Sequence, residues 1–201
     1  MLKNKPLVLV FCKNQILGKV KSRLALKIGQ KKALLIYSEL VNKTASIVNS
    51  LSAEVHVYYS NYIEENDNFN PTKIKKFIQK GNNLGDRIIN ALNTSFKKFS
   101  PVVIIGSDLW KLEISDIEDA FRILKNKNIV IGPSTDGGYY LIGINFLDTK
   151  IFENKDWGGE SLLNDTIRDI DDKKNIHLLD EKNDVDTYDD LSQFPDLKIK
   201  L

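Results

Sequence analysis

A basic segment near the start of this 201-residue chain holds the residue types that bind phosphate. In GKVKSRL, residues 18–24, Lys19, Lys21 and Arg23 follow the flexible Gly18. Ligands of open α/β sheets lie outside the carboxyl ends of the strands, and this loop follows a predicted strand. The pattern therefore predicts an anion-binding loop, although a solvated basic loop would have the same composition.

An aspartate follows the apolar run VVIIG, residues 102–106, within the segment GSDLWKL. A carboxylate held by rigid backbone at the end of a strand suits Mg²⁺, which proteins bind through one or two carboxylates together with substrate phosphates. Asp108 is therefore a candidate metal ligand and catalytic residue. In the competing interpretation, Asp108 only satisfies the backbone of a turn.

A second acidic segment, NDVDTYDDL at residues 183–191, lies near the C-terminus. Its four aspartates are Asp184, Asp186, Asp189 and Asp190. One interpretation is structural: Asp186 or Thr187 caps a helix whose acidic first turn complements the helix dipole. In the functional interpretation, one of these aspartates completes a metal site with Asp108.

The segment DGGYYLIG, residues 136–143, begins with two glycines that permit close approach of a ligand. Asp136 and Tyr139 could then face a substrate. Asp-Gly is also the strongest short signal for a hairpin turn, and the two interpretations are compatible.

Other residue types offer less chemistry. His56 and His177 are isolated and lack metal-ligand spacing, so both are predicted to be structural. The single cysteine, Cys12, is predicted to be a buried strand residue. The sequence contains neither a Walker motif nor G-x-G-x-x-G after the first strand, which argues against a P-loop NTPase or a dinucleotide dehydrogenase.

The elements that must position these residues alternate between strands and helices. Continuous apolar runs predict strands buried on both faces at 7–11 and 102–106. Steps of three and four residues between apolar side chains predict a helix over 31–48, and Ser115 with Glu118 predicts a capping box for a helix ending near 125. Further strands are predicted at 54–59, 74–78, 129–131, 139–144 and 176–179, and further helices after residues 87, 157 and 186. This order predicts an α/β fold, a three-layer α/β/α sandwich around a mainly parallel, mixed sheet.

Size and charge bound the function. The chain is short enough for one domain, residues 1–201, and its 42% hydrophobic content suits an ordinary globular protein. A formal charge of +2 offers no bulk attraction for nucleic acid or an anionic membrane. We expect no membrane span, because no apolar run reaches about 18 residues, and a cytoplasmic location, because no signal peptide is evident.

Six segments, taken in order, resemble a bacterial family of GT-A nucleotide-diphospho-sugar transferases. They are KVKSRL, QKGNNLGDR, GSD, GPSTDGGYYLIG, WGGES and DVDTYDDL. Members of that family are uncharacterised glycosyltransferases or selenodomain-associated transferases and are similar to 2-phospholactate guanylyltransferase. The resemblance spans about residues 6–194. It implies a GT-A fold, and a metal-dependent enzyme that uses a nucleotide or nucleotide-sugar substrate and a small acceptor.

The resemblance also implies roles for single residues. Lys21 and Arg23 would contact the nucleotide phosphates, and Asp108 and Asp186 would bind Mg²⁺ or Mn²⁺. The loop with two glycines in GNNLGDR would lie near the base, and the DGGY segment and WGGE would line the acceptor side. The predicted substrate-binding residues are Gly18, Gly81, Gly85, Arg87, Asp136, Gly137, Gly138, Tyr139, Trp157 and Glu160.

Two departures from the family pattern leave alternatives open. The first loop lacks the prolines usual before Lys-x-Arg, and Trp110 stands where a proline commonly follows GSD. We expect glycosyl transfer from a nucleotide-diphospho-sugar. The alternatives are nucleotidyl transfer, which releases pyrophosphate, and a degenerate nucleotide-binding module without catalysis.

Overall fold

A seven-stranded sheet forms the centre of the protein in the computed structural model, which describes residues 5–171 and 173–200. Residues 1–4 of the predicted domain thus lie outside the described part. The strand order is β3-β2-β1-β4-β6-β5-β7. The strands are β1 (Leu7–Cys12), β2 (Glu54–Tyr59), β3 (Ile74–Ile78), β4 (Val102–Ile105), β5 (Ile129–Pro133), β6 (Tyr139–Ile144) and β7 (Ile176–Leu178). Within the described residues, β6 alone runs antiparallel to its neighbours, β4 and β5.

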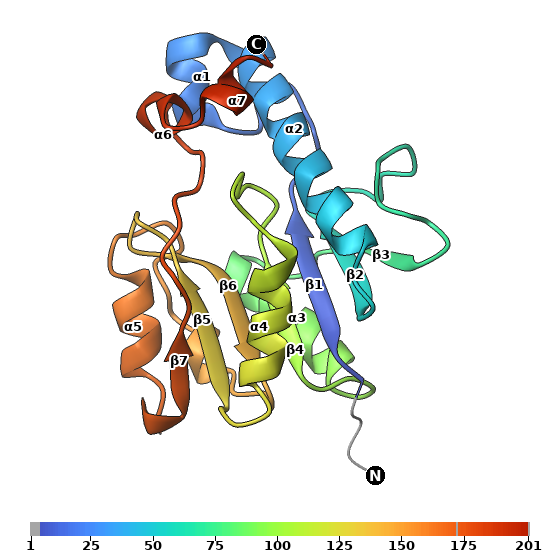
Figure 1. The fold of residues 1–201 in the computed structure, drawn as a ribbon, viewed down its shortest axis with the longest axis vertical. Helices are drawn as coiled ribbons and strands as arrows, with labels where there is room; N and C mark the ends of the chain where they lie inside the picture. Colours follow the sequence, from blue (N-terminus) through green and yellow to red (C-terminus); the bar gives the residue numbers. More distant parts are fainter. Residues whose placement is uncertain (1–4, 172, 201) are drawn as a thin grey trace.

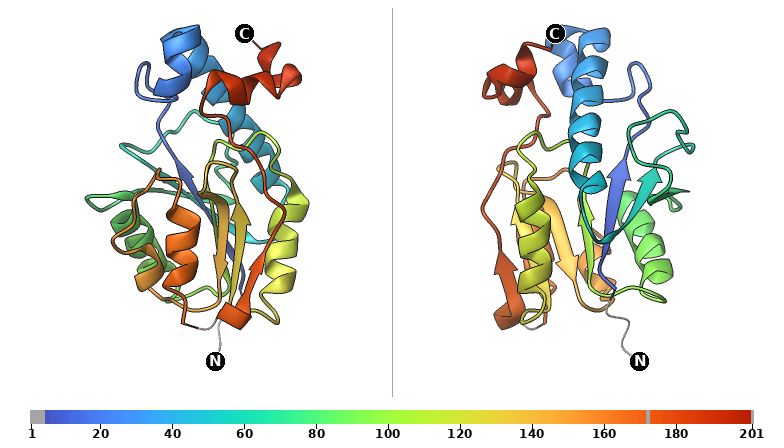
Figure 2. Two further views of the ribbon diagram at one scale, coloured as in Figure 1. Left: turned by 90° about the vertical axis from the view of Figure 1, so that its left-hand side faces the viewer. Right: turned by 45° about the vertical axis from the view of Figure 1, so that its right-hand side comes forward.

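Helices cover both faces of this sheet (Figures 1 and 2). They are α1 (Ser22–Ile28), α2 (Gln30–Asn49), α3 (Leu84–Ser95), α4 (Ile114–Ile123), α5 (Leu162–Arg168), α6 (Tyr188–Ser192) and α7 (Pro195–Lys198). Short 3-10 helices span Lys150–Phe152 and Lys173–Asn175. Side chains of α2 and α4 pack on one face, and those of α3 and α5 on the other. The predicted three-layer sandwich with a mainly parallel, mixed sheet is confirmed.

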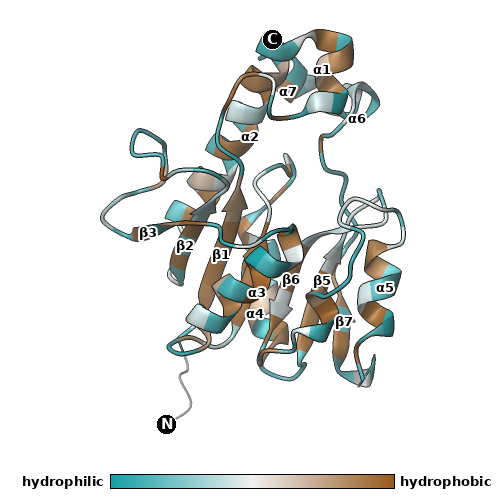
Figure 3. Cartoon of the chain, turned by 180° about the vertical axis from the view of Figure 1, so that it is seen from behind, coloured by the Kyte–Doolittle hydropathy of each residue, from teal (hydrophilic) through white to brown (hydrophobic). Residues whose placement is uncertain are grey.

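The alternation of side chains along the strands builds two cores. In β1, Val8 and Val10 pack on the α2 face, whereas Leu7 and Leu9 pack on the α3 face. Figure 3 shows hydrophobic strands between helices that are hydrophilic on their outer sides. No helix in the described part of the chain is long and apolar enough to cross a membrane.

The structure corrects two local predictions. The helix predicted over 31–48 is α2, but a separate helix, α1, precedes it because Gly29, with φ 83°, breaks the helical path. The capping box of α4 is formed by Glu113 and Asp116, not by Ser115 and Glu118. Ser115 and Glu118 fit the usual Ser-x-x-Glu pattern, whereas Glu113 and Asp116 do not, and α4 begins two residues earlier than that pattern predicts.

Helices α1, α6 and α7 gather at the end of the molecule toward which β1 points (Figure 1). Helix α1 contacts α6, and α7 contacts α6 and α2, at the carboxyl edge of the parallel strands. This arrangement brings the basic loop at 18–24 and the acidic segment at 183–191 to the same edge.

Candidate active site

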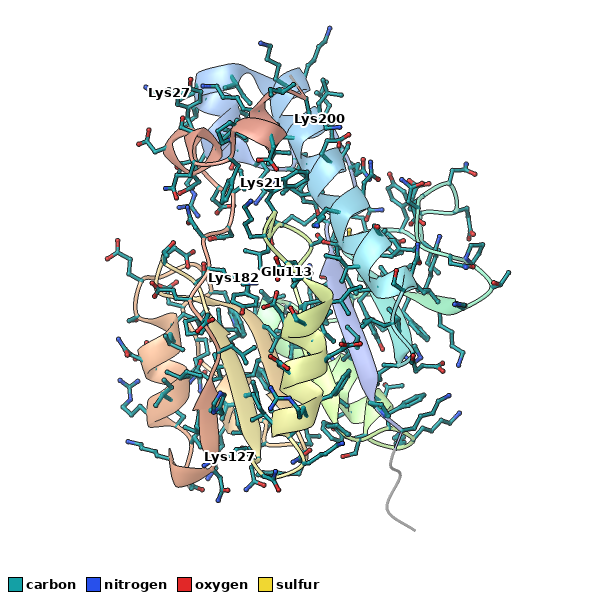
Figure 4. The ribbon with its side chains drawn as sticks, in the orientation of Figure 1. Lys21, Lys27, Glu113, Lys127, Lys182 and Lys200 are labelled. Atoms are coloured by element: carbon teal, nitrogen blue, oxygen red, sulfur yellow. The ribbon has the colours of Figure 1, made fainter. Side chains whose placement is uncertain are left out.

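The four residues predicted to bind phosphate and metal meet at this edge. The Lys21 ammonium donates to Asp108 Oδ2 at 3.0 Å and to Asp186 Oδ1 at 2.6 Å. Arg23 Nη2 donates to the other Asp186 oxygen at 2.8 Å. Figure 4 shows Lys21 beneath α1, α6 and α7, facing the loop that follows β4. Lys21 and Asp186 are 165 residues apart in the sequence, and the fold brings their side chains into contact.

The backbone of Lys21 adopts an unfavourable conformation. It precedes α1 with φ 47° and ψ 48°, a left-handed conformation that costs a residue with a side chain about 1–2 kcal/mol. Its side chain is only 4% exposed, whereas that of Arg23 is 61% exposed. Strained residues of this kind persist where the surrounding structure fixes them, often at functional sites.

The charges of the site stabilise one another. Burial alone would lower the pKa of Lys21, but Asp108 and Asp186 raise it above its usual value, so the ammonium stays charged. Burial would likewise raise the pKa of Asp186, yet Lys21 and then Arg23 hold it below its usual value. Both carboxylates that face Lys21 therefore form ion pairs at neutral pH.

A third carboxyl group, Asp184, lies near this pair. Burial is the main cause that raises its pKa to about 6, and the negative charges of Asp108, Asp136 and Asp186 add to the rise. A hydrogen bond of 2.8 Å from Ser134 Oγ acts in the opposite direction. The site thus holds more negative than positive charge once Asp184 ionises.

The negative charge of Asp108, Asp184 and Asp186 suits the binding of a divalent cation. Within residues 5–171 and 173–200, no three His, Cys, Asp or Glu side chains converge on one metal position. Asp108 and Asp186 do converge on a single cation, the Lys21 ammonium. Two carboxylates suffice for Mg²⁺ when substrate phosphates supply further oxygen ligands.

Different residues of the acidic segment at 183–191 cap helix α6 and contribute to the site. Thr187 is the N-cap of α6 and forms a capping box with Asp190. Asp190 Oδ2 accepts from the backbone N–H groups of Thr187 and Asp186, at 2.7 and 3.2 Å. The carboxylate of Asp186 is therefore not the cap, and it is available to Lys21 and Arg23.

The loop GNNLGDR shapes the start of α3. Asn83 caps this helix by accepting from Asp86 N, and Gly81, with φ 145°, leaves no room for a Cβ. Gly85 packs so closely on Phe152 that a Cβ would lie 2.3 Å from its carbonyl oxygen. Arg87 donates to the Gly81 carbonyl and the Gln79 side chain, so it braces this loop.

Gly18 shapes the first loop. It adopts φ 76°, and a Cβ there would lie 3.1 Å from the Gln30 side chain. A left-handed conformation with little space around it favours glycine.

The DGG segment forms the hairpin turn between β5 and β6. Asp136 Oδ1 accepts from Gly138 N at 2.9 Å, and Ser134 N donates to the Gly138 carbonyl. Gly137, with φ 87°, lies against Glu160, where a Cβ would come within 2.0 Å of the carbonyl oxygen. The hairpin interpretation is confirmed, and the turn holds the WGGE segment in place.

Tyr139 and Trp157 also lie together, as an edge-to-face ring pair with centroids 6.2 Å apart. The Tyr139 hydroxyl is buried, which raises its pKa. Trp157 is half-buried and lines a cavity of about 230 Å³. Tyr139 therefore supports Trp157 and offers no accessible hydroxyl to a substrate.

Three positioning residues were not predicted. The Tyr37 hydroxyl accepts from Lys13 N at 2.9 Å and shares a hydrogen bond of 3.0 Å with Ser107 Oγ, so it ties the ends of β1 and β4 together. Asn14 is buried and joins the loop after β1 to the loop after β2 through Asn61 N and the Tyr62 carbonyl. The sequence carries no local signal for these bonds, because their partners lie far along the chain.

The fold and the site define a transferase of the nucleotide-diphospho-sugar transferase class. A structure from Desulfovibrio desulfuricans G20, provisionally described as such a transferase, matches at 28% identity with a TM-score of 0.85, covering 94% of this chain and 85% of that one. The chain belongs to the DUF2064 family, described as uncharacterised proteins conserved in bacteria, which matches residues 43–159. No curated protein matches the sequence.

Two more distant structures share the fold. CMP:2-keto-3-deoxy-manno-octonic acid synthetase, complexed with CTP, matches at 10% identity with a TM-score of 0.57, covering 98% of this chain and 99% of that one. The manganese complex of Rv0371c from Mycobacterium tuberculosis H37Rv matches at 10% identity with a TM-score of 0.59, covering 94% and 97%. At this identity the likeness concerns the fold alone.

Proposed function

We propose that this protein is a metal-dependent transferase that uses a nucleotide-linked donor, and that it transfers a glycosyl group from a nucleotide-diphospho-sugar to a small acceptor. One observation carries the proposal: Lys21, Arg23, Asp108 and Asp186 form one cluster of charges at the carboxyl edge of the sheet. Ligands of open α/β folds bind at that edge. The similarity to the Desulfovibrio structure favours the glycosyl donor.

Each residue of the cluster has a role in this reaction. Asp108 and Asp186 would hold Mg²⁺ or Mn²⁺, which supplies positive charge to the phosphates and stabilises the departing nucleoside diphosphate. Lys21 and Arg23 orient the phosphates and add positive charge as negative charge develops. Arg23 is the more exposed of the two, and its planar guanidinium can bind two phosphate oxygens at once.

Nucleotidyl transfer is the second candidate. The same cluster suits a nucleoside triphosphate, and one protein with this fold is complexed with CTP. In that reaction an acceptor oxyanion attacks the α-phosphate, and pyrophosphate leaves. The third candidate is a module that binds a nucleotide but does not catalyse a reaction.

A thermal-shift screen tests the shared part of these proposals. Nucleoside triphosphates and nucleotide sugars are added separately, each with Mg²⁺, with Mn²⁺ or with a chelator. A ligand at 100 times its dissociation constant stabilises a protein by about 2.7 kcal/mol. We expect at least one nucleotide to raise the melting temperature when metal is present. If no nucleotide raises the melting temperature with either metal, the proposal that the protein binds a nucleotide is wrong.

Product analysis then separates the three candidates. Release of nucleoside diphosphate indicates glycosyl transfer, and release of pyrophosphate indicates nucleotidyl transfer. Binding without either product, across a panel of acceptors, indicates the module.

A further inference from the structure

The ammonium of Lys21 bridges the two carboxylates that are proposed to bind metal. It donates to Asp108 Oδ2 at 3.0 Å and to Asp186 Oδ1 at 2.6 Å, and Arg23 donates to Asp186 Oδ2 at 2.8 Å. Three of the four oxygens of these carboxylates therefore accept from a cationic side chain. Carboxylate oxygens are also the ligands that suit Mg²⁺ and Mn²⁺. The cations of the protein and a divalent ion thus need the same atoms.

The two carboxylates can be reached from solvent, whereas the ammonium is buried. The side chains of Asp108 and Asp186 are 43% and 29% exposed, and that of Lys21 is 4% exposed. A divalent ion that arrives from solvent therefore meets both carboxylates with the ammonium already bonded to them. Two cations held by the same oxygens lie close together, and like charges at short range repel. The Lys21 contacts and a bound divalent ion are therefore mutually unfavourable.

Nucleotide phosphates offer the Lys21 ammonium a second set of acceptors. A lysine ammonium has three donors on a flexible stem of four carbons, so it can exchange one anion for another without a change in the backbone. The proposed function places the phosphates at the same edge of the sheet as Lys21. Hydrogen bonds from Lys21 to phosphate would release the oxygens of Asp108 and Asp186.

We propose that Lys21 competes with the divalent ion for Asp108 and Asp186, so that the ion binds tightly only when the nucleotide phosphates take up the Lys21 ammonium. Lys21 thus sets the order of binding: the nucleotide binds before or together with the metal, and a free ion is held off. The inference rests on the proposed function, because it assigns Lys21 a second role at the same site.

A second buried lysine provides a matched control. The Lys76 side chain is 9% exposed and lies 2.8 Å from the carboxylate of Asp67, which is 4% exposed. Its other hydrogen bond goes to the Glu64 carbonyl. Lys76→Met therefore removes the same charge from a buried ion pair, but it leaves a single carboxylate where Lys21→Met leaves two. Two carboxylates hold a divalent ion better than one.

Titration of Mn²⁺ alone, without nucleotide, tests the competition. The electron paramagnetic resonance signal of free Mn²⁺ measures how much of the ion is bound. We expect the dissociation constant for Mn²⁺ to fall about tenfold or more in Lys21→Met, because removing one member of a buried ion pair leaves the charge of the others uncompensated. Asp108→Asn in the Lys21→Met background should abolish this gain, and Lys76→Met should show none.

The repulsion between the two carboxylates is expected to destabilise Lys21→Met, so thermal melting is measured as well. Mn²⁺ should raise the melting temperature of this variant by more than that of the wild type, because the ion replaces the missing charge. Lys21→Gln removes the charge but keeps a hydrogen-bond donor for the carboxylates. It should show the same gain in Mn²⁺ affinity, and it keeps the test decisive if Lys21→Met does not fold.

The proposal is overturned if the Lys21 variants bind Mn²⁺ no more tightly than the wild type. It is also overturned if Lys76→Met gains as much affinity, or if the gain survives Asp108→Asn, because the ion would then bind elsewhere. These titrations contain no nucleotide, whereas the thermal-shift screen of the proposed function depends on one. Failure of the competition and failure of nucleotide binding can therefore be told apart.

Discussion

Lys21 is at the centre of the site because it satisfies two carboxylates at once. Its ammonium lies within 3.0 Å of Asp108 and within 2.6 Å of Asp186, while its backbone is held in a left-handed conformation. Such a buried cation keeps two neighbouring carboxylates from repelling each other. Arg23 extends the same positive charge to the exposed surface, where a nucleotide would arrive.

Arg23 should matter for nucleotide affinity more than for stability. Its ion pair with Asp186 is largely exposed, and such pairs contribute about 0–1 kcal/mol. We expect Arg23→Ala to weaken nucleotide binding by about tenfold or more, because a bidentate phosphate donor is lost, with little change in melting temperature. Calorimetric titration and thermal melting measure the two effects.

Arg122→Ala is the control for this change. Arg122 is 68% exposed and forms an equally short ion pair of 2.8 Å with Asp119, away from the site. It should alter neither property. Equal nucleotide affinity in the Arg23 and Arg122 variants would show that the basic loop is only a solvated surface.

Asp184 should make stability depend on pH. Its pKa is raised from 3.8 to about 6, so between these values the folded protein retains a proton that the unfolded chain has lost. The free energy of unfolding therefore falls as the pH rises from about 4 to 6. Asp184→Asn removes this penalty and can still accept from Ser134. We expect it to be more stable than the wild type at pH 8, on the order of 1 kcal/mol after solvent screening, and not at pH 4.

Thermal melts at both pH values, with a chelator present, check this prediction. Glu118→Gln, at an exposed side chain of α4, serves as the control and should show no such difference between pH 4 and pH 8. A constant offset for Asp184→Asn at both pH values would mean that its carboxyl group titrates normally.

At the scale of elements, the hairpin between β5 and β6 positions the segment around Glu160. Gly137 and Gly29 have similar positive φ angles, 87° and 83°, but different surroundings. A Cβ on Gly137 would lie 2.0 Å from the Glu160 carbonyl oxygen, whereas a Cβ on Gly29 would meet nothing within 4 Å. The pair therefore separates backbone strain from steric contact.

Gly29→Ala should lower the free energy of unfolding by about 1–3 kcal/mol, because φ 83° with ψ 155° is a conformation that residues with a Cβ rarely adopt. Gly137→Ala should cost more than this, because the Glu160 segment must also move. Denaturant unfolding of the two variants measures the difference. If both lose the same amount, the close packing of Gly137 on Glu160 does not contribute to stability.

Elements with a strong periodic or continuous pattern could be predicted from the sequence. The strands at 7–11 and 102–106 are continuous apolar runs because both of their faces are buried. The start of α4 could not be predicted, because in LEISDIE, residues 112–118, the usual Ser-x-x-Glu pattern begins two residues after Glu113, which forms the box with Asp116. The separate helix α1 was missed for a related reason, since its seven residues include a single fully buried side chain, Leu24.

The site was predictable in its residue types but not in its connections. The resemblance named Lys21, Arg23, Asp108 and Asp186, and the structure brings all four together. The sequence could not show that Lys21 itself bridges the two aspartates. The sequence could not show the hydrogen bonds of the Tyr37 hydroxyl either, because its partners lie 24 and 70 positions away along the chain.

At the scale of the whole molecule, the site joins two parts of the fold. Lys21 and Asp186 belong to the segments that lead into α1 and α6, whereas Asp108 follows β4 of the sheet (Figure 1). A ligand bound between them contacts both parts. Metal and nucleotide should therefore bind cooperatively, because the metal supplies the positive charge that the phosphates and both carboxylates require.

The central claim is that Asp108 and Asp186 share one metal. It is tested most directly by calorimetric titration of nucleotide into Asp108→Asn and Asp186→Asn, with Mg²⁺ and with a chelator. Both changes keep the shape and remove one charge. Asp189→Asn, an exposed neighbour on α6, is the control. We predict that both site variants fold, lose the dependence of nucleotide binding on Mg²⁺, and lose activity on the order of 100- to 1,000-fold. Unchanged metal dependence in both would contradict the shared site.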